Sequence, residues 1–331
     1  MSQKLVIQTA PATLVSTADV EMEHIPALVA GAGPQAAMRF VEFFTANIRN
    51  VHTRRAYYRA VVGFFDWCQE RDLGELGRIL PIHIAAYIEE LQQAQSKSTV
   101  KQHLAAVRML FDYLVIGQIV PVNPATSVRG PKHVVKKGKT PVLSAEEARL
   151  LLDSVDTSHV VGLRDRALIG IMTYTFARVG AVIAMRVEDY YPQGKRWWVR
   201  LHEKGGKHHE MPAHHKLDLY LDEYRVEAGI ADDKKGFLFR TANGKTRMLT
   251  EQPMQQADVF RMIRRRAKDA GILTPMNCHT FRATGITNYL ENGGTLEKAQ
   301  FMAAHESSRT TGLYDRRNDA VTLDEVERIS I

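Results

Sequence analysis

Residues 279–282 read HTFR and residues 304–314 read AHESSRTTGLY, with a helix-like run between them. Arginine offers a rigid fork of donors that fits phosphate oxygens, and histidine can donate a hydrogen bond or move a proton near neutral pH. A tyrosine can act as a nucleophile through its phenol oxygen if its proton is removed and the product charge is stabilised. Together these side chains suit covalent attack on a phosphodiester. Such a reaction also needs a second cation, a general acid and a grip on nucleic acid, which the remaining sequence must supply.

The composition is that of a folded protein with a polyanionic partner. The chain has 331 residues, of which 45% are hydrophobic, and this predicts about two packed domains. Its net charge of +7 favours a polyanion, although overall charge alone is weak support. Cys68 and Cys278 are far apart, which argues against a disulfide scaffold or a zinc finger and fits a reducing compartment. The sequence shows neither a membrane-spanning apolar run nor a signal peptide, so we expect a cytoplasmic protein.

The N-terminal part is predicted to be a flexible arm followed by a helical domain. Residues 1–34 show only weak periodicity, whereas residues 35–120 repeat apolar side chains at helical spacing. Basic side chains lie outside the predicted apolar faces and are candidate DNA contacts, although a charged face is more often simply solvated. These candidates are Arg54, Arg55, Lys97, Lys101 and Arg108.

A basic linker is predicted over residues 121–142. Its prolines and glycines forbid a continuous helix, and no acidic residue offsets its lysines. An extended cationic segment between two domains could follow a duplex and neutralise phosphates. The alternative is a solvated hinge. We name Lys132, Lys136 and Lys137 as candidate DNA contacts.

A second domain is predicted over residues 143–331. An apolar run surrounds Arg178, and a buried arginine is unfavourable unless it is paired or faces a ligand. An ordinary salt bridge is the alternative. Further on, residues 197–202 and 208–212 read as a hairpin whose turn presents Lys204, although lysines are common in turns. A helix predicted over residues 251–270 has the densest basic cluster, from which we select Arg264 and Arg265 as candidate DNA contacts.

The histidines of the second domain do not predict a metal site. A zinc-protease helix needs two histidines four residues apart, and the pair His209-Glu210 has Ala213 where the second would stand. Pro212 also argues against a helix there. We therefore expect neither a metal nor another cofactor.

Six residues appear in an order that resembles the tyrosine recombinase, or phage integrase, family. They are Arg178, Lys204, His279, Arg282, His305 and Tyr314. The resemblance extends from about residue 35 to the tyrosine. It implies a helical, SAM-like core-binding domain and a mixed, mainly α catalytic domain with a small antiparallel sheet. In this family the two domains form a C-shaped clamp around DNA.

The resemblance implies site-specific recombination through a covalent intermediate. Tyr314 would attack a DNA phosphodiester and leave a 3′-phosphotyrosyl link with a free 5′-hydroxyl. The two arginines would hold the non-bridging oxygens, and His305 would add a hydrogen bond. Lys204 would be the general acid toward the leaving oxygen, and His279 the base toward the tyrosine. The covalent link conserves the energy of the broken bond, so no metal or nucleotide would be needed.

The chain departs from the family pattern at three positions. Ala181 stands where an acidic residue commonly follows the first arginine by three positions. Ala304 replaces the usual glycine before His305, and Ala283 replaces a frequent second histidine after Arg282. None of these changes removes a group that performs chemistry. They leave open how the first arginine is braced.

The resemblance also implies partners. These are double-stranded DNA with an inverted-repeat-like site and four copies of the chain on two sites, with a monomer or weak oligomer in the absence of DNA. An accessory protein is a further possibility. The segment 320–331, anchored by Val326 and Ile329, would either dock on a neighbouring subunit or pack on its own domain. Two alternatives remain open: a DNA-binding accessory protein of the same fold without chemistry, and topoisomerase-like relaxation. The sequence does not distinguish integration, excision and resolution of a DNA element.

Overall fold

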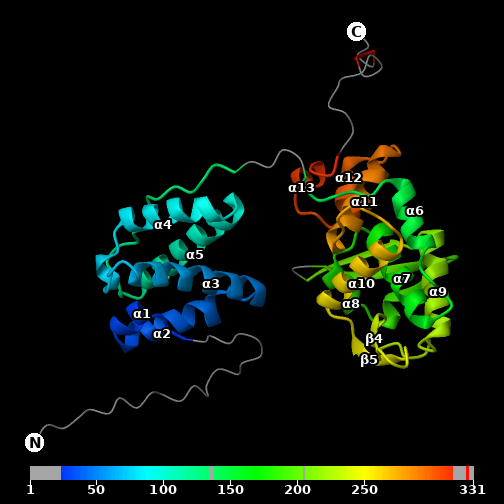
Figure 1. Ribbon diagram of the computed structural model, residues 1–331, viewed down its shortest axis with the longest axis horizontal. Helices are drawn as coiled ribbons and strands as arrows, with labels where there is room; N and C mark the ends of the chain where they lie inside the picture. Colours follow the sequence, from blue (N-terminus) through cyan, green and yellow to red (C-terminus); the bar gives the residue numbers. More distant parts are fainter. Residues whose placement is uncertain (1–23, 134–137, 204–205, 316–325, 328–331) are drawn as a thin grey trace, which may run out of the picture. The chain divides into compact units, whose positions relative to one another are not determined.

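The structure is a computed structural model that describes residues 24–133, 138–203, 206–315 and 326–327. The chain divides at Val134 and Val135 into two compact units, one mainly blue to cyan and the other green to red in Figure 1. Each unit has its own hydrophobic core. In the part of the chain that is described, no helix is long and apolar enough to cross a membrane.

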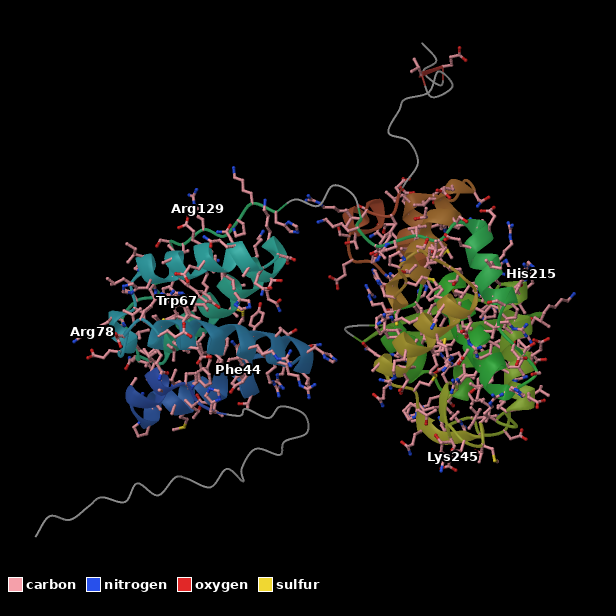
Figure 2. All side chains as sticks on the ribbon, in the orientation of Figure 1. Phe44, Trp67, Arg78, Arg129, His215 and Lys245 are labelled. Atoms are coloured by element: carbon pink, nitrogen blue, oxygen red, sulfur yellow. The ribbon has the colours of Figure 1, made fainter. Side chains whose placement is uncertain are left out.

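The first unit is entirely helical. Helices α3 and α5 pack along each other, and phenylalanines from several helices fill the core with ring centroids about 5–6 Å apart. Figure 2 labels one of them, Phe44, which is fully buried. The elements are α1 (Ala27–Gly31), α2 (Pro34–Glu42), the π-helical turn η1 (Phe43–Asn47), α3 (Val51–Gln69), the 3-10 turn η2 (Leu76–Arg78), α4 (Pro81–Ala94) and α5 (Lys97–Ile116).

Local sequence signals set the helix starts of this unit. The Asn50 side chain accepts a hydrogen bond from the Thr53 N–H, and the Ser96 hydroxyl accepts one from the Thr99 N–H. Such N-caps satisfy backbone donors that the first helical turn leaves unpaired. Pro81 opens α4, where its missing N–H has no consequence.

The predicted flexible arm extends too far into the chain. Leu28 and Val29 of α1 are buried in the core, and the Tyr58 hydroxyl donates to the His24 carbonyl at 2.7 Å. Residues 24–33 therefore belong to the helical unit. A helix of one turn without a side-chain cap leaves little periodicity to detect. The rest of the arm, residues 1–23, lies outside the described residues.

The predicted linker is also shorter than expected, because both of its ends pack on folded units. Ala125 and Val128 are buried in the first core, and Arg129 beside them projects outward (Figure 2). At the other end, the Gly138 N–H donates to the Leu313 carbonyl at 2.9 Å, and Val142 packs against the second unit. Lys136 and Lys137 lie outside the described residues.

The second unit places helices around two small antiparallel sheets. The three-stranded sheet has the order β1-β2-β3, and the two-stranded sheet pairs β4 with β5. The elements are α6 (Ala145–Asp153), α7 (Val160–Tyr174), α8 (Val179–Ala184), the 3-10 turn η3 (Val187–Asp189), β1 (Tyr190–Gln193), β2 (Arg196–Glu203), β3 (Lys207–Pro212), α9 (His215–Glu227), β4 (Arg240–Ala242), β5 (Leu249–Pro253), α10 (Gln256–Asp269), α11 (Cys278–Glu291), α12 (Leu296–Met302) and α13 (Ser308–Gly312).

Helix α7 is the centre of this unit. Its residues from 162 to 172 are buried with the single exception of position 166, and it packs against α6, α8, α9 and α11. Burial on nearly all sides is expected of a helix in the interior of a domain. Because α8 and α11 both rest on this rigid helix, the ends of these two helices are held in a fixed relation.

The β-hairpin agrees with the sequence prediction, whereas the basic helix begins later than expected. Strand β2 pairs with β3 in a register that places Leu201 opposite His209. The predicted helix over residues 251–270 begins only at Gln256, because residues 249–253 instead pair with β4. Strand β4 ends only seven residues before β5 begins, so the two strands form a hairpin, and helical periodicity alone does not reveal this pairing.

Candidate active site

Helix α11 carries two of the predicted residues three positions apart, so both lie on one side of the helix. The Asn277 side chain caps the helix by accepting from the His279 N–H at 2.8 Å. Arg282 is only 1% exposed, and its two terminal nitrogens donate to the carbonyls of Phe176 and Ala303. Its Nε–H has no hydrogen-bond partner among the residues that the structure describes. The guanidinium is thus fixed from two sides, and its Nε–H remains without a partner among the described residues.

His305 is positioned by the end of α12. The His305 N–H donates to the Gln300 carbonyl at 3.1 Å, and the Ala304 N–H donates to the Phe301 carbonyl at 2.9 Å. This pair of bonds is a Schellman motif, which requires a left-handed residue after the helix. Ala304 supplies it with φ of +46°, a conformation that is easier for the glycine common in the family. The motif turns the chain so that the His305 ring is buried.

Tyr314 is held just after α13, and its hydroxyl meets α11. The Tyr314 oxygen lies 2.5 Å from His279 Nε2. The Thr287 hydroxyl donates to the Tyr314 carbonyl at 2.9 Å, which ties the end of this segment to α11. The ring of His305 lies parallel to the tyrosine ring with centroids 5.9 Å apart, and the tyrosine is 7% exposed. The structure therefore brings together four of the six predicted residues, namely His279, Arg282, His305 and Tyr314.

Burial and two arginine charges set the protonation of this cluster. Burial lowers the pKa of His279, and the charges of Arg282 and Arg178 lower it further. The same three causes, together with His279, lower the pKa of His305 to about 3. Both imidazoles are therefore neutral at pH 7. Burial also lowers the Arg282 pKa to about 10, so this guanidinium keeps its charge.

Burial and neighbouring positive charges have opposite effects on the pKa of the Tyr314 phenol. Burial raises the pKa of the phenol, whereas the charges of Arg282 and Arg178 and a hydrogen bond from Arg282 lower it. The burial effect is the largest, so the phenol is protonated at neutral pH. Its deprotonation needs a base and nearby positive charge, and both are present in its surroundings.

Arg178 lies near this cluster, because its charge acts to lower the pKa values of His279, His305 and Tyr314. It is the N-cap residue of α8, and its side chain is 37% exposed. Its Nη1 donates to Glu203 Oε2 at 2.6 Å, and its backbone N–H donates to Glu203 Oε1 at 3.3 Å. The salt bridge to Glu203 therefore stabilises the charge of Arg178 within its apolar run of sequence, and part of the guanidinium is exposed to solvent.

A cavity of about 750 Å³ adjoins the cluster. It is bounded by the N-terminal ends of α8, α10 and α11 and by the end of β2. Its charged and titratable lining includes Arg178, Glu203, His202 and His279, with Phe260 on the α10 side. The cavity gives a substrate access to Arg178 and to the edge of His279.

Lys204 lies outside the described residues, so its placement relative to the cluster stays a prediction. Glu203 directly before it was missed by sequence reasoning. The detectable signal was strand alternation, because Glu203 follows the buried Val199 and Leu201 at a spacing of two. The sequence prediction ends the first strand of the hairpin at residue 202 and therefore assigns Glu203 to the turn.

The basic residues predicted to contact DNA divide into three groups. Arg54 donates to the Ile48 carbonyl at 3.0 Å, and Arg108 donates to the carbonyls of Ala125 and Val128. These two guanidinium groups hold neighbouring chain segments, so the structure gives both a structural role, and their contact with DNA stays a prediction. Exposed side chains form the second group: Arg55, Lys97, Lys101 and Lys132.

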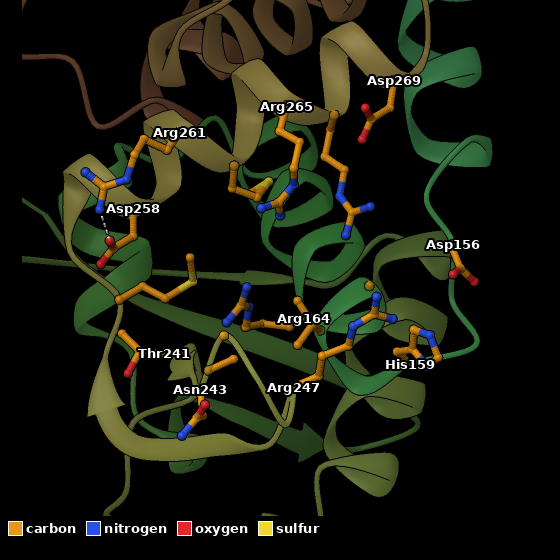
Figure 3. A pocket seen from close by; sticks show the side chains of 17 residues that line it. Asp156, His159, Arg164, Thr241, Asn243, Arg247, Asp258, Arg261, Arg265 and Asp269 are labelled. Atoms are coloured by element: carbon orange, nitrogen blue, oxygen red, sulfur yellow. Dashed lines mark hydrogen bonds and ion pairs between the residues drawn. The ribbon is translucent and has the colours of Figure 1, made fainter.

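Arg264 and Arg265, the third group, lie on two different flanks of α10. Arg264 lies 5.6 Å from the ring of Phe260, which lines the cavity next to the cluster. Arg265 instead faces a second cavity of about 560 Å³, shown in Figure 3, and contacts the buried Asp165 at 3.3 Å. The same carboxylate also binds Arg164 and Arg266. This ion network joins α7 to α10, which gives Arg265 a structural partner that periodicity alone did not predict.

The histidines of the hairpin are dispersed. His202 and His208 face each other with ring centroids 4.7 Å apart on the outer side, whereas His209 is buried against Phe301. Within the described ranges, no group of three or more His, Cys, Asp or Glu side chains is placed to hold a metal ion.

Comparisons with known proteins agree with this arrangement. A family model described as "Phage integrase family" matches residues 141–320, and one described as "Phage integrase, N-terminal SAM-like domain" matches residues 39–117. The chain is 28% identical over 227 residues to the tyrosine recombinase XerD of Listeria monocytogenes, covering 67% of this chain and 73% of the relative. It is 29% identical over 231 residues to the tyrosine recombinase XerC of Chlamydia muridarum, covering 69% of each.

Solved structures share the fold. The XerH site-specific recombinase, in a post-cleavage complex with a palindromic difH substrate, has a TM-score of 0.68 at 19% identity, over 89% of this chain and 87% of that chain. A lambda integrase tetramer bound to a Holliday junction has a TM-score of 0.63 at 17% identity, over 86% and 79%. The predicted pair of a SAM-like helical domain and a mainly α domain with small sheets is thereby confirmed. Because the first family model alone spans more than half of the chain, this protein belongs to the phage integrase family and is a tyrosine-type site-specific DNA recombinase.

Proposed function

We propose that Tyr314 is the nucleophile that cleaves DNA in this recombinase. Its Oη would form a bond to the scissile phosphorus while the bond from phosphorus to the 5′-oxygen breaks. The product is a 3′-phosphotyrosyl link and a free 5′-hydroxyl, and a 5′-hydroxyl from a partner duplex reverses the reaction to join new ends. The observation that carries this proposal is the 2.5 Å contact between the tyrosine oxygen and His279 Nε2, beside two arginines.

His279 is the proposed acceptor of the phenol proton. A general base must be within hydrogen-bond distance of the proton that it takes, and it must be unprotonated at the working pH. The contact to Tyr314 meets the first condition. The lowered pKa of His279 meets the second, with Nδ1 carrying the imidazole proton and Nε2 free to accept.

Arg282 and Arg178 are the proposed clamps on the non-bridging phosphate oxygens. Negative charge on these oxygens grows in the transition state, so donors that are already aimed at them contribute most to the rate. Arg282 offers its unpaired Nε–H and a fixed position. His305, neutral and stacked beside the tyrosine, is a third proposed donor to the phosphate through Nε2–H, with its Nδ1 at 2.9 Å from the Thr311 hydroxyl.

Lys204 is the proposed general acid for the departing 5′-oxygen. It follows Glu203 directly in sequence, and Glu203 contacts Arg178. A lysine proton delivered to the 5′-oxygen would balance the proton that the phenol gives to His279.

The proposed assembly is a tetramer on two DNA sites of inverted-repeat character. The XerH structure contains a palindromic substrate, and the lambda integrase structure is a tetramer on a Holliday junction. In our proposal the helical unit and the catalytic unit clamp the duplex between them. Val326 is 49% exposed and is a proposed anchor between subunits, while Ile329 lies outside the described residues.

A covalent adduct with DNA tests the proposed nucleophile. Nicked duplexes made from the DNA that flanks this protein's own gene would be mixed with the protein without magnesium and then denatured. We expect a protein–DNA adduct with the wild type and with Tyr289→Phe, a control that removes a hydroxyl elsewhere on α11. Tyr314→Phe should bind the same duplexes and form none.

The same experiment separates the competing activities. An adduct that persists in Tyr314→Phe would remove this residue from its role. Binding without an adduct in the wild type would favour a DNA-binding protein without chemistry. Relaxation of any supercoiled plasmid regardless of sequence would favour a topoisomerase-like activity over site-specific exchange.

A further inference from the structure

Glu203 is a buried carboxylate at the edge of the proposed cleavage centre. Strand β2 directs Val199, Leu201 and Glu203 inward, and their exposed fractions are 0%, 0% and 6%. The first two belong to the hydrophobic core. A carboxylate in such a row is strongly unfavourable unless a cation and hydrogen-bond donors compensate for the lost water.

Arg178 supplies both kinds of compensation. Each carboxylate oxygen of Glu203 receives one bond, Oε2 from Nη1 at 2.6 Å and Oε1 from the backbone N–H at 3.3 Å. The second bond joins the carboxylate to the backbone of the residue that caps α8. Glu203 therefore fixes the backbone and the guanidinium of Arg178 together. Among the described residues, Nε and Nη2 of the same guanidinium make no hydrogen bond, so two donor nitrogens remain for a phosphate.

Helix α8 cannot brace this arginine by itself. A partner on the same helix would stand three or four positions along, and these positions hold Ala181 and Val182, both buried and apolar. The brace comes instead across the fold, from the end of β2. Glu203 directly precedes Lys204 in the sequence.

We infer that Glu203 is the positioning residue for Arg178, and that its contact holds this arginine in register with Tyr314. This inference rests on the proposed function, in which Arg178 clamps the scissile phosphate. Glu203 touches neither DNA nor the reacting atoms in this account. It acts by limiting the orientations of a side chain that is otherwise long, flexible and partly exposed.

The sign of the change in cleavage rate distinguishes two possible roles of Glu203, which are to position Arg178 or to block its access to the phosphate. If Glu203 only withheld Arg178 from the phosphate, removal of its charge would release the arginine and raise the cleavage rate. If it positions Arg178, removal of its charge lowers the rate and leaves DNA affinity almost unchanged, because affinity comes from many phosphate contacts.

The test compares single-turnover cleavage of the nicked duplexes at saturating DNA in the wild type, Glu203→Gln and Glu210→Gln. The control Glu210 lies on β3 of the same hairpin and pairs at 2.7 Å with Arg200, with its side chain 43% exposed. We expect Glu203→Gln to lower the rate about 30-fold, with a Kd within about threefold, and Glu210→Gln to match the wild type. Thermal unfolding checks each variant. If the glutamine variant does not fold, Glu203→Asp replaces it, with an expected loss of about tenfold, because the shorter side chain keeps its charge but loses reach.

A double-mutant cycle distinguishes positioning from general structural damage. If Glu203 acts through Arg178, the same substitution should change the rate by less than about threefold in an Arg178→Lys background. An equal 30-fold loss in that background would overturn the inference, as would an unchanged or raised rate in Glu203→Gln alone. Absence of an adduct in every protein, including the wild type, would contradict the proposed function instead.

Discussion

The two arginines of the proposed site are held in opposite ways. Arg282 lies 1% exposed inside the second unit, and two backbone carbonyls fix its guanidinium. Arg178 has a side chain that is 37% exposed at the start of a short helix, and one carboxylate from a hairpin fixes it. The first arginine is part of the core, whereas the second depends on a single contact across the fold.

Because of this difference, we expect the two arginines to contribute unequally to the cleavage rate and to folding stability. Removing a residue that is built into the core disturbs structure and chemistry together. Removing a residue at the rim disturbs mainly the chemistry, apart from the partner that it leaves behind. The comparison therefore predicts different ratios of rate loss to stability loss for two residues with the same proposed task.

Arg282→Ala should have the largest effect. We expect the cleavage rate at saturating DNA to fall about 1000-fold or more, because a fixed transition-state donor is lost. We also expect the free energy of unfolding to fall by about 2–4 kcal/mol, because two buried carbonyls lose their donors. Single-turnover cleavage and urea unfolding measure the two effects. An intact unfolding free energy would contradict the core role of this residue.

Arg178→Ala should lower the rate about 100- to 1000-fold with a smaller loss of stability, about 1–2 kcal/mol, because Glu203 is left buried without its cation. Adding Glu203→Gln to this variant should recover about 1 kcal/mol of unfolding free energy and none of the rate. Urea unfolding of the single and double variants measures the recovery. A double variant less stable than Arg178→Ala would show that the carboxylate has another essential partner.

The sequence alone predicted the features that depend on residues close together in the chain, and it did not predict those that depend on contacts between distant segments. His279 and Arg282 are three residues apart on one helix, so their spacing in the sequence was enough to predict that both lie on one side of it. Tyr314 is far from that helix in the sequence. Its pairing with His279 was therefore predicted from the family resemblance and not from spacing. Strand alternation indicates that Glu203 faces inward. Its bond to Arg178 and the carbonyl partners of Arg108 depend on contacts between separate segments, which no periodicity in one segment records. For the same reason periodicity does not predict the contact of Arg265 with Asp165, 100 residues away. Contact of Arg265 with DNA stays a prediction.

Acid should destabilise the protein through the buried imidazoles. The pKa of His305 is about 3 in the folded chain, against an ordinary value near 6.5, so below pH 6.5 the unfolded chain binds a proton that the folded chain excludes. Stability is therefore lost as pH falls, by about 2 kcal/mol from this group at pH 5. Urea unfolding between pH 7 and pH 5 should show the loss, and His305→Gln should reduce it. An identical pH dependence in the variant would contradict the buried neutral imidazole.

The smallest expected effect concerns the turn before His305. Ala304 has φ of +46°, where a side chain is strained, so Ala304→Gly should stabilise the protein by about 0.5–1 kcal/mol. Ala303 beside it has φ of −82° and provides the matched control, because glycine there should destabilise by a similar amount. Thermal unfolding of the two variants in parallel tests the sign. A loss of stability in Ala304→Gly would show that the turn is not strained.

The identity of the residue bonded to DNA tests the central claim most directly. A denatured adduct would be digested with nuclease and trypsin, and the nucleotide-bearing peptide identified by mass spectrometry. The account predicts a nucleotide on the peptide of residues 310–316, in which Tyr314 is the only tyrosine. A nucleotide on any other peptide would contradict the assignment of the nucleophile and the geometry built around it.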